Sequence, residues 1–495
     1  MYSIGYDIGT SSIKASLLEL ESGRVVKQIA YPDNEMEIIT HAEGWAEQDP
    51  NEWWNAVCSA TKKLLSITDV KPEQIKSIGI AYQMHGLVLV DKNQELLRSS
   101  IIWCDSRSVD IGDKALQDLG DDYCFGHLLN TPGNFTASKL KWVQDNEAEL
   151  YQKIHKAMLP GDYIAMKLSG EINTTVSGLS EGIFWDFKNN SLATTLLDYY
   201  GIDTGILPTV VENFEPQGKV SKTAADQTGL AEGTAITYRA GDQPNNALSL
   251  NILNPGDIAA TGGTSGVVYG ISDSLKYDDQ SRVNGFAHVN HSNESIRIGQ
   301  LLCINGAGSQ YAWIRKNISD SHTSYADMET LIASIPIGSE GLRILPYGNG
   351  AERMLNNRLT GAQFSNVQFN THRKEHFYRA ALEGIAFSFV YGIKVLENLG
   401  IEPKLIRVGN DNLFQSSTFS NTIVNLLGCS IEMVETTGAT GAAKASGIGI
   451  GFYSNLKEAV GGLKVIKEYI PATENGAYEE AYSSWGHALS KLIES

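Results

Sequence analysis

Residues Asp7 to Ala15 read DIGTSSIKA, and their pattern occurs a second time in the chain. The segment is interpreted as the end of one strand, a tight Gly-Thr-Ser turn and the start of the next strand. About half a chain later, Gly263 to Val268 (GTSGVV) repeats the turn and the apolar strand. Such a turn presents backbone N–H groups and hydroxyls with little side-chain bulk, which suits phosphate oxygens. The pair predicts two similar lobes that grip one polyphosphate; two unrelated hairpins are the alternative.

The composition is typical of a soluble globular protein with more than one domain. The 495 residues are 42% hydrophobic and 19% charged, and the formal net charge is −18. A chain of this length exceeds one ordinary hydrophobic core, so two large domains are expected. The acidic balance argues against nucleic acid and against an anionic membrane surface, because both attract clusters of Lys and Arg.

The cysteine pattern and the apolar runs predict a cytoplasmic protein. The five cysteines are scattered, and none forms a Cys-x-x-Cys pair, which argues against a disulfide framework and a zinc site. The start of the chain lacks the basic and apolar regions of a signal peptide. Apolar runs elsewhere are shorter than the roughly 20 residues that span a bilayer.

Local patterns in the first half predict an α/β fold. Three strands follow one another at 2–7, 13–20 and 25–31, and a helix at 49–65 begins with Asp49 as N-cap and proline in its first turn. Strands and helices then alternate, which is typical of α/β domains.

The Asn-Pro-Gly-Asp turn at 254–257 predicts the boundary between the lobes. It gives an N-terminal lobe of residues 1–252 and a C-terminal lobe of residues 253–495. The second lobe is expected to open with a hairpin at 258–271 and to continue with a helix at about 375–399 and a strand at 405–408. A glycine-rich stretch at 438–451 is expected to lead into a C-terminal helical segment.

Two aspartates lie at strand ends, where a metal-binding or catalytic role is expected. Asp7 ends the first strand before the phosphate-type turn, where a carboxylate suits a Mg²⁺ ion placed between it and a polyphosphate. Asp242 follows Gly241 at another strand end, and ligands of open α/β sheets bind at the carboxyl ends of strands. It is a candidate general base toward a hydroxyl. A turn or cap role is the alternative for both, and Lys14 is either a phosphate contact or a solvated strand residue.

Two loops carry side chains that suit a sugar. Gln83, Met84 and His85 combine hydrogen-bonding groups with a flexible apolar one between two apolar strands. Trp103 and Asp105 follow another apolar strand, and an aromatic ring beside charged groups is a plausible sugar platform. A satisfied structural histidine is the alternative for His85.

Several familiar motifs are missing from the sequence. It contains no Gly-x-x-x-x-Gly-Lys-Ser/Thr, no dinucleotide fingerprint, no His-Glu-x-x-His and no Gly-x-Ser-x-Gly. The segment 438–444 resembles a P-loop, but its spacing is wrong. Nucleotide binding by a P-loop is therefore excluded.

The segments above, taken together, resemble the FGGY carbohydrate kinases of the sugar kinase, Hsp70 and actin superfamily. The resemblance runs along essentially the whole chain, and QMHG at 83–86 is most similar to the xylulokinase branch. The motifs that carry it are 6–11 (YDIGTS), 45–50 (WAEQDP), 83–86 (QMHG), 103–107 (WCDSR), 135–142 (FTASKLKW), 159–163 (LPGDY), 241–242 (GD), 263–266 (GTSG), 345–347 (LPY) and 350–353 (GAER).

This resemblance implies an actin-like ATPase (ribonuclease H-like) fold, with a mixed five-stranded sheet flanked by helices in each lobe and an active site in the interlobe cleft. It implies that Asp242 is the catalytic base, which also contacts sugar and metal, and that Asp7 is the other metal-side carboxylate. The sugar-binding candidates are Gln83, Met84, His85, Trp103 and Asp105. The nucleotide-binding candidates are Thr10, Ser11, Ser12, Lys14, Gly263, Thr264, Gly308, Gly409 and Asn410.

The implied reaction transfers a phosphoryl group from ATP, with Mg²⁺, to a ketopentose, and in D-xylulose the acceptor is the 5-hydroxyl. Ribulose, L-xylulose, gluconate and glycerol remain alternative substrates. A nucleotide-switched ATPase like actin or Hsp70 is the alternative from a different class. The expected partners are the sugar and ATP, without nucleic acid or membrane, and a homodimer is expected from the family.

Three segments depart from the family pattern, and all lie beside the implied cleft. Residues 408–412 (VGNDN) replace the usual glycine-rich turn near the adenine, although Asn tolerates left-handed backbone. Residues 354–355 are Met-Leu where xylulokinases usually have Thr-Pro. Residues 243–246 (QPNN) differ from the Asn-Ala-Ala that usually follows the base. These departures keep an unusual sugar among the alternatives.

Overall fold

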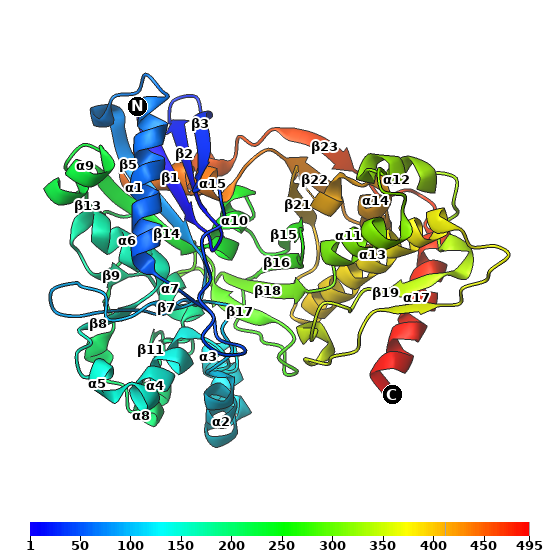
Figure 1. Cartoon of the computed structure of the whole chain (residues 1–495), viewed down its shortest axis with the longest axis horizontal. Coiled ribbons are helices and arrows are strands. Elements are labelled where there is room, and N and C mark those ends of the chain that lie inside the picture. Colours follow the sequence, from blue (N-terminus) through cyan, green and yellow to red (C-terminus); the bar gives the residue numbers. More distant parts are fainter. Residues whose placement is uncertain (411, 495) are drawn as a thin grey trace.

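The computed structural model describes residues 1–410 and 412–494, so Asp411 of the departing turn lies outside the described residues. Two α/β lobes lie side by side (Figure 1). The first lobe has a six-stranded sheet in the order β13-β14-β5-β1-β2-β3. Its strands are β1 (Tyr2–Ile8), β2 (Ile13–Glu19), β3 (Arg24–Tyr31), β5 (Ile75–Tyr82), β13 (Gly218–Lys219) and β14 (Ala235–Gly241).

The second lobe has a seven-stranded sheet in the order β17-β18-β16-β15-β21-β22-β23. Its strands are β15 (Asp257–Gly262), β16 (Gly266–Ser272), β17 (Asn284–Ala287), β18 (Ile298–Ile304), β21 (Leu405–Gly409), β22 (Ile431–Val434) and β23 (Val465–Tyr469).

The two sheets share one plan. In the first, β1, β2 and β3 form an antiparallel meander, and β5 and β14 continue the sheet parallel to β1. In the second, β15, β16 and β18 form the meander, and β21 and β22 continue it in parallel. The repeated Gly-Thr-Ser turns therefore join equivalent strands of two similar lobes, as predicted. The expected count of five strands holds for this shared core only, because β13, β17 and β23 extend the sheet edges by antiparallel pairing.

Short two-stranded sheets lie outside the two main sheets. They are β4 (Glu47–Gln48) with β7 (Ser100–Ile101), β6 (Val88–Val90) with β8 (Lys156–Met158), β9 (Asn173–Thr174) with β12 (Thr209–Val210), β10 (Trp185–Asp186) with β11 (Ser191–Leu192), and β19 (Arg343–Leu345) with β20 (Gln363–Ser365).

Helices flank both sheets. The expected helix N-cap is confirmed, because an Asp49 carboxylate oxygen accepts the Asn51 N–H at 2.9 Å where α1 begins. The helices of the first half are α1 (Pro50–Ser66), α2 (Val109–Leu119), α3 (Asp121–Leu128), α4 (Thr136–Asn146), α5 (Ala148–Tyr151), α6 (Pro160–Ser169), α7 (Val176–Glu181), α8 (Thr194–Tyr200), α9 (Lys222–Thr228) and α10 (Asp242–Ser249). Those of the second half are α11 (Gly308–Ile318), α12 (Tyr325–Ile332), α13 (Lys374–Asn398), α14 (Ser417–Leu427), α15 (Gly438–Gly449), α16 (Leu456–Val460) and α17 (Gly476–Glu494).

Helix α15 belongs to the second half of the sequence but packs on the sheet of the first lobe, beside β1 and β2 (Figure 1). The glycine-rich stretch expected to precede a helix is therefore itself helical. Its backbone lies so close to the sheet that a Cβ atom at Gly5 would be 1.9 Å from the Ala439 carbonyl oxygen, and one at Gly79 would be 2.0 Å from that of Ala442. Small residues on both sides permit this approach. The second half of the chain thus contributes a helix to the first lobe.

No helix among residues 1–410 and 412–494 combines the length and the apolar character that a membrane-crossing segment needs.

Candidate active site

Three strands of the first sheet end together and carry the main candidate residues. Asp7 lies beside Ala81 in the parallel β1–β5 pair, and Ala240 lies beside Ala81 in the parallel β5–β14 pair. Asp7 and Asp242 therefore flank the end of β5 from opposite sides, and the loop that begins at Gln83 leaves the sheet between them. Carboxyl ends of neighbouring strands are where open α/β sheets bind ligands.

Both carboxyl groups have raised pKa values. The pKa of Asp242 is raised from 3.8 to about 7, first because burial disfavours the charged form and second because the Asp7 charge is close by. Burial also raises the pKa of Asp7, while Lys14 lowers it. The Lys14 Nζ is 3.8 Å from an Asp7 carboxylate oxygen, so in the structure this lysine pairs with the aspartate of its own hairpin.

The raised pKa of Asp242 predicts a pH-dependent stability. Between pH 4 and 7 the folded state holds a proton on Asp242 that the unfolded state has released, so the free energy of unfolding falls as pH rises through this window. Asp242→Asn removes the charge, and we expect it to raise the apparent stability by about 1–2 kcal/mol more at pH 8 than at pH 4, because solvent in the cleft screens part of the full shift. Urea unfolding of both proteins at the two pH values measures this, and an equal change at both would contradict the charge coupling.

The first hairpin turn is held by neighbouring side chains. The Gly9 N–H donates to the Ser12 carbonyl at 3.2 Å and closes the turn. The Trp103 Nε1–H donates to the Thr10 hydroxyl at 3.0 Å, and that hydroxyl donates to the Gln83 side-chain carbonyl at 3.3 Å. Gln83 and Trp103, both candidates for the sugar, therefore support the phosphate-type turn; the Trp103 ring is 54% exposed and keeps a free face at the rim.

The second hairpin turn borders a cavity of about 610 Å³. The Gly308 N–H donates to the Gly263 carbonyl and the Ser309 N–H to the Thr264 carbonyl, both at 3.0 Å, so the turn rests on the start of α11. A Cβ atom at Gly308 would be 2.3 Å from the Gly263 carbonyl oxygen, which explains a glycine there. The lining brings the candidates Gly263, Thr264 and Gly308 together with Tyr311, Ala312, Tyr325, Leu413 and Ser416. Aromatic and apolar groups beside backbone donors suit a nucleotide base and its phosphates.

The two candidates proposed for the adenine do not line this cavity. Gly409 ends β21, where it pairs with Val434, and Asn410 is exposed and accepts a hydrogen bond from Gln415 at its carbonyl. The cavity instead takes Asn412 and Gln415 from the following turn. Gly409 and Asn410 therefore lie outside the lining of this cavity, and their contact with the adenine stays a prediction.

The His85 ring has one nitrogen that can accept a hydrogen bond. Its Nδ1 is 2.9 Å from the Glu181 carbonyl oxygen, which can only accept, so Nδ1 carries the proton and Nε2 has a free lone pair. Burial lowers the pKa of His85 to about 3, so the ring is neutral. Phe135 and Phe286 pack against the ring with centroids 4.8 and 5.3 Å away. Such an arrangement can accept a hydrogen bond from a sugar hydroxyl.

Two buried charged residues near His85 were missed by sequence reasoning. The Lys139 ammonium donates to the carbonyls of His85 at 2.9 Å and Ile102 at 3.0 Å, and burial lowers its pKa to about 7. The Glu181 carboxyl lies under Gly241, where an added Cβ would be 2.7 Å from its Oε2, and burial raises its pKa well above 4.5. Met84 packs against the same glycine. In sequence, a lone Lys or Glu usually indicates a solvated surface residue, so only the fold reveals the burial of these two.

Asp105 is not free to bind a sugar. One carboxylate oxygen accepts the Arg107 N–H at 2.9 Å and the other accepts the Ala46 N–H at 2.6 Å, and the Arg107 guanidinium pairs with both. That guanidinium lies 3.9 Å from the Trp45 ring centroid. The expected sugar contact is corrected to a structural ion pair, because Asp105 is fully buried behind the loop.

Ser11 and Ser12 remain at the first turn, where Ser11 is exposed and its carbonyl accepts the Met36 N–H at 2.9 Å. Within residues 1–410 and 412–494, no three His, Cys, Asp or Glu side chains gather as a metal site. Asp7 and Asp242 supply two carboxylates at the ends of the strands on either side of β5. Mg²⁺ is commonly held by one or two carboxylates, with water and substrate phosphates completing its shell, so this donor pair fits that ion.

These features define a two-lobed α/β fold with paired phosphate-type turns and a carboxylate after β14, and solved carbohydrate kinases share this fold. The chain belongs to the FGGY family of carbohydrate kinases: the family's N-terminal domain model matches residues 2–249 and its C-terminal domain model matches residues 258–449. It is therefore a sugar kinase.

Relatives over nearly the whole length are named as kinases of xylulose-type sugars. The xylulose kinase of Bacillus subtilis (strain 168) is 28% identical over 476 residues, which cover 92% of this chain and 90% of the relative. The L-xylulose/3-keto-L-gulonate kinase of Escherichia coli (strain K12) is 27% identical over 503 residues, covering 99% and 97%. The structure of xylulose kinase from Rhodospirillum rubrum matches the fold with a TM-score of 0.89 at 24% identity, covering 99% of each chain.

Proposed function

We propose that this kinase transfers the γ-phosphoryl group of ATP to the 5-hydroxyl of D-xylulose. The observation that carries the proposal is the Asp242 carboxyl, which follows β14 at the start of α10, next to the glycine that Met84 contacts, and whose pKa burial and the Asp7 charge raise to about 7. A base with a pKa near the working pH combines a deprotonated population with a useful affinity for the proton. Xylulose kinases among the full-length relatives support the choice of sugar.

In the proposed mechanism Asp242 orients the attacking hydroxyl and accepts its proton at a carboxylate oxygen. The His85 Nε2 accepts a hydrogen bond from another sugar hydroxyl, while Lys139 fixes the His85 loop through its carbonyl. Positioning supplies most of the acceleration in phosphoryl transfer, since the protein has little covalent chemistry to perform.

On the nucleotide side, the turns at Thr10 and Thr264 donate to phosphate oxygens from the two lobes. Asp7 and Asp242 are the residues that would hold Mg²⁺, which would offset the negative charge on the transferred group. Without the ion, burial and the Asp7 charge raise the pKa of Asp242. Movement of the lobes toward each other would exclude water, a competing nucleophile, from the site.

L-xylulose and related keto sugars form the second candidate substrate class, favoured by the E. coli relative that acts on them by name. A coupled assay of ADP release with D-xylulose, L-xylulose, D-ribulose, L-ribulose, gluconate and glycerol separates the candidates. We expect kcat/KM for D-xylulose to exceed that for each other compound by at least about tenfold, the effect of one well-placed hydroxyl contact. A higher value for another sugar would reassign the substrate. ATP turnover that no sugar stimulates would contradict kinase activity toward all of them.

We also propose a cytoplasmic homodimer for the active form. Light scattering of the purified chain tests the oligomeric part, and a monomer at assay concentrations would refute it.

A further inference from the structure

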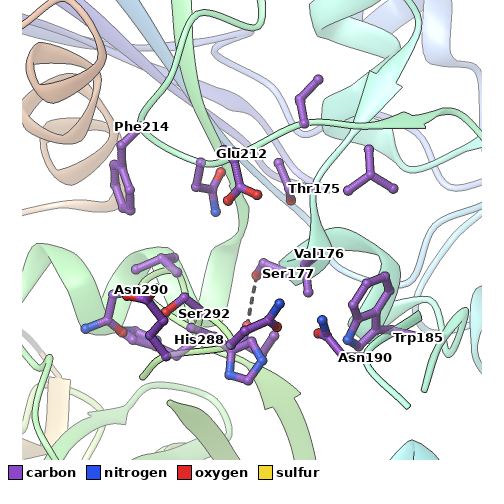
Figure 2. Close-up of a pocket in the computed structure, with 18 of the residues that line it drawn as sticks. Thr175, Val176, Ser177, Trp185, Asn190, Glu212, Phe214, His288, Asn290 and Ser292 are labelled. Carbon is purple, nitrogen blue, oxygen red and sulfur yellow. Dashed lines mark hydrogen bonds between the residues drawn. The ribbon is translucent and has the colours of Figure 1, made fainter. Parts of the chain in front are cut away.

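A second cavity, of about 600 Å³, lies between the lobes and includes none of the candidate site residues. Its volume is within the range of small-molecule sites. In Figure 2, Phe214, Glu212 and Thr175 lie along one side of an open space, and Asn290 and His288 lie along the other. The first three residues belong to the first half of the chain and the last two to the second half, so a molecule bound here would touch both lobes.

Polar atoms beside this cavity lack partners. The Trp185 Nε1–H, the Asn213 Oδ1 and the Asn290 Oδ1 have no hydrogen-bond partner among the described residues, and Trp185 is only 8% exposed. The Asn290 amide is anchored through its Nδ2, which donates to the Leu253 carbonyl at 3.2 Å. Buried polar atoms are nearly always paired, and each unpaired one costs about 1–3 kcal/mol. One donor and two acceptors without partners thus lie in the wall of this cavity.

The lining selects against negative charge. None of the described lining residues is Lys or Arg, while Glu212 and Glu294 contribute carboxylates. His288 stays neutral because burial lowers its pKa to about 3. An anionic ligand would lose its hydration without gaining a counter-charge. Hydroxyls, amides and the Trp185 and Phe214 rings are instead the surroundings that an uncharged sugar or polyol requires.

Helix α7 connects this cavity to the catalytic site. Ser177 lines the cavity, and its hydroxyl donates to the Ala287 carbonyl of β17 at 2.9 Å. Ser180 accepts the Ala287 N–H at 3.0 Å. The helix ends at Glu181, whose carbonyl orients His85. A ligand that shifts α7 against β17 would therefore move His85, the residue proposed to bind the sugar.

We propose that this cavity binds an uncharged sugar or polyol at a site separate from the substrate and that the bound molecule bridges the two lobes through α7. The inference concerns binding and does not depend on which sugar the enzyme phosphorylates.

Titration calorimetry of the wild-type chain with xylitol, D-sorbitol and D-xylose tests the proposal. Trp185→Phe keeps the ring and removes the unpaired donor, and Asn213→Leu removes an unpaired acceptor. Each substitution should weaken binding of at least one probe by about tenfold, the loss of one hydrogen bond. Trp313→Phe, on the exposed surface of α11, is the matched control and should leave binding unchanged.

Three outcomes would overturn the proposal. One is the absence of binding by all three probes. Another is binding that survives both cavity substitutions and disappears in Asp242→Leu, which would place the probe in the catalytic cleft. The third is binding of D-ribose 5-phosphate as tight as that of the neutral probes, since Glu212 and Glu294 should repel it. Calorimetry needs no turnover, so a failure of the proposed activity leaves this test intact.

Discussion

Asp242→Asn is expected to lower kcat by about 10²- to 10⁴-fold, the usual contribution of a positioned general base. The amide keeps the size and hydrogen bonds of the side chain but cannot accept the proton, so KM for the sugar should change little. In the wild type, kcat/KM should fall about tenfold per pH unit below pH 7, because protonation of a group whose pKa is about 7 removes the base. Steady-state kinetics over a pH series measure both quantities.

The control for this substitution is Asp273→Asn, which makes the same change on an exposed loop after β16. It should retain wild-type kinetics at every pH. Near-normal turnover of Asp242→Asn would remove this residue from the role of base. A raised KM with unchanged kcat would instead make Asp242 a binding residue only.

Gly79→Ala is expected to lower the free energy of unfolding by at least about 3 kcal/mol. The added Cβ would be 2.0 Å from the Ala442 carbonyl oxygen and 2.6 Å from its carbon, which are backbone atoms of α15 that cannot rotate away. Either β5 or α15 must move, and the packing between the lobes is lost with it. Urea unfolding followed by far-UV circular dichroism measures the change.

Gly126→Ala is the matched control, because it lies in α3 and an added Cβ there meets no atom within 4 Å. It should be neutral or slightly stabilising, since alanine favours helix. Equal stability of the two variants would show that α15 does not pack on β5 at this distance.

Much of the fold was predictable from short-range patterns. Alternating apolar residues located the hairpins, Asp49 and Pro50 located the start of α1, and the glycine turn after Asn254 located the start of the second sheet. The edge strands escaped prediction because two to five residues carry too little pattern. Helix α15 was hidden by its glycines, which lower helix propensity but are required for the close approach to β1 and β5.

The sequence predicted those site residues that lie at the end of a strand or directly after it. Asp7, Asp242, Met84 and His85 were located in this way, and their roles in binding and catalysis stay predictions. Asp105 was assigned to the sugar because a charged side chain after a strand resembles a ligand contact. The Ala46 N–H, which is distant in the chain, and the Arg107 guanidinium of the same motif both use its oxygens.

By itself the sequence determined that this protein has two similar lobes, each with a phosphate-type hairpin, because strand periodicity and turn chemistry are local properties. The tertiary structure alone decided which charges face one another. The pKa of Asp242 depends on burial and on Asp7, which is 235 positions away in the chain, and the pairing of Lys139 with the His85 loop depends on helix packing. Desolvation and Coulomb forces depend on distance in space, so these properties arise only when the chain has folded.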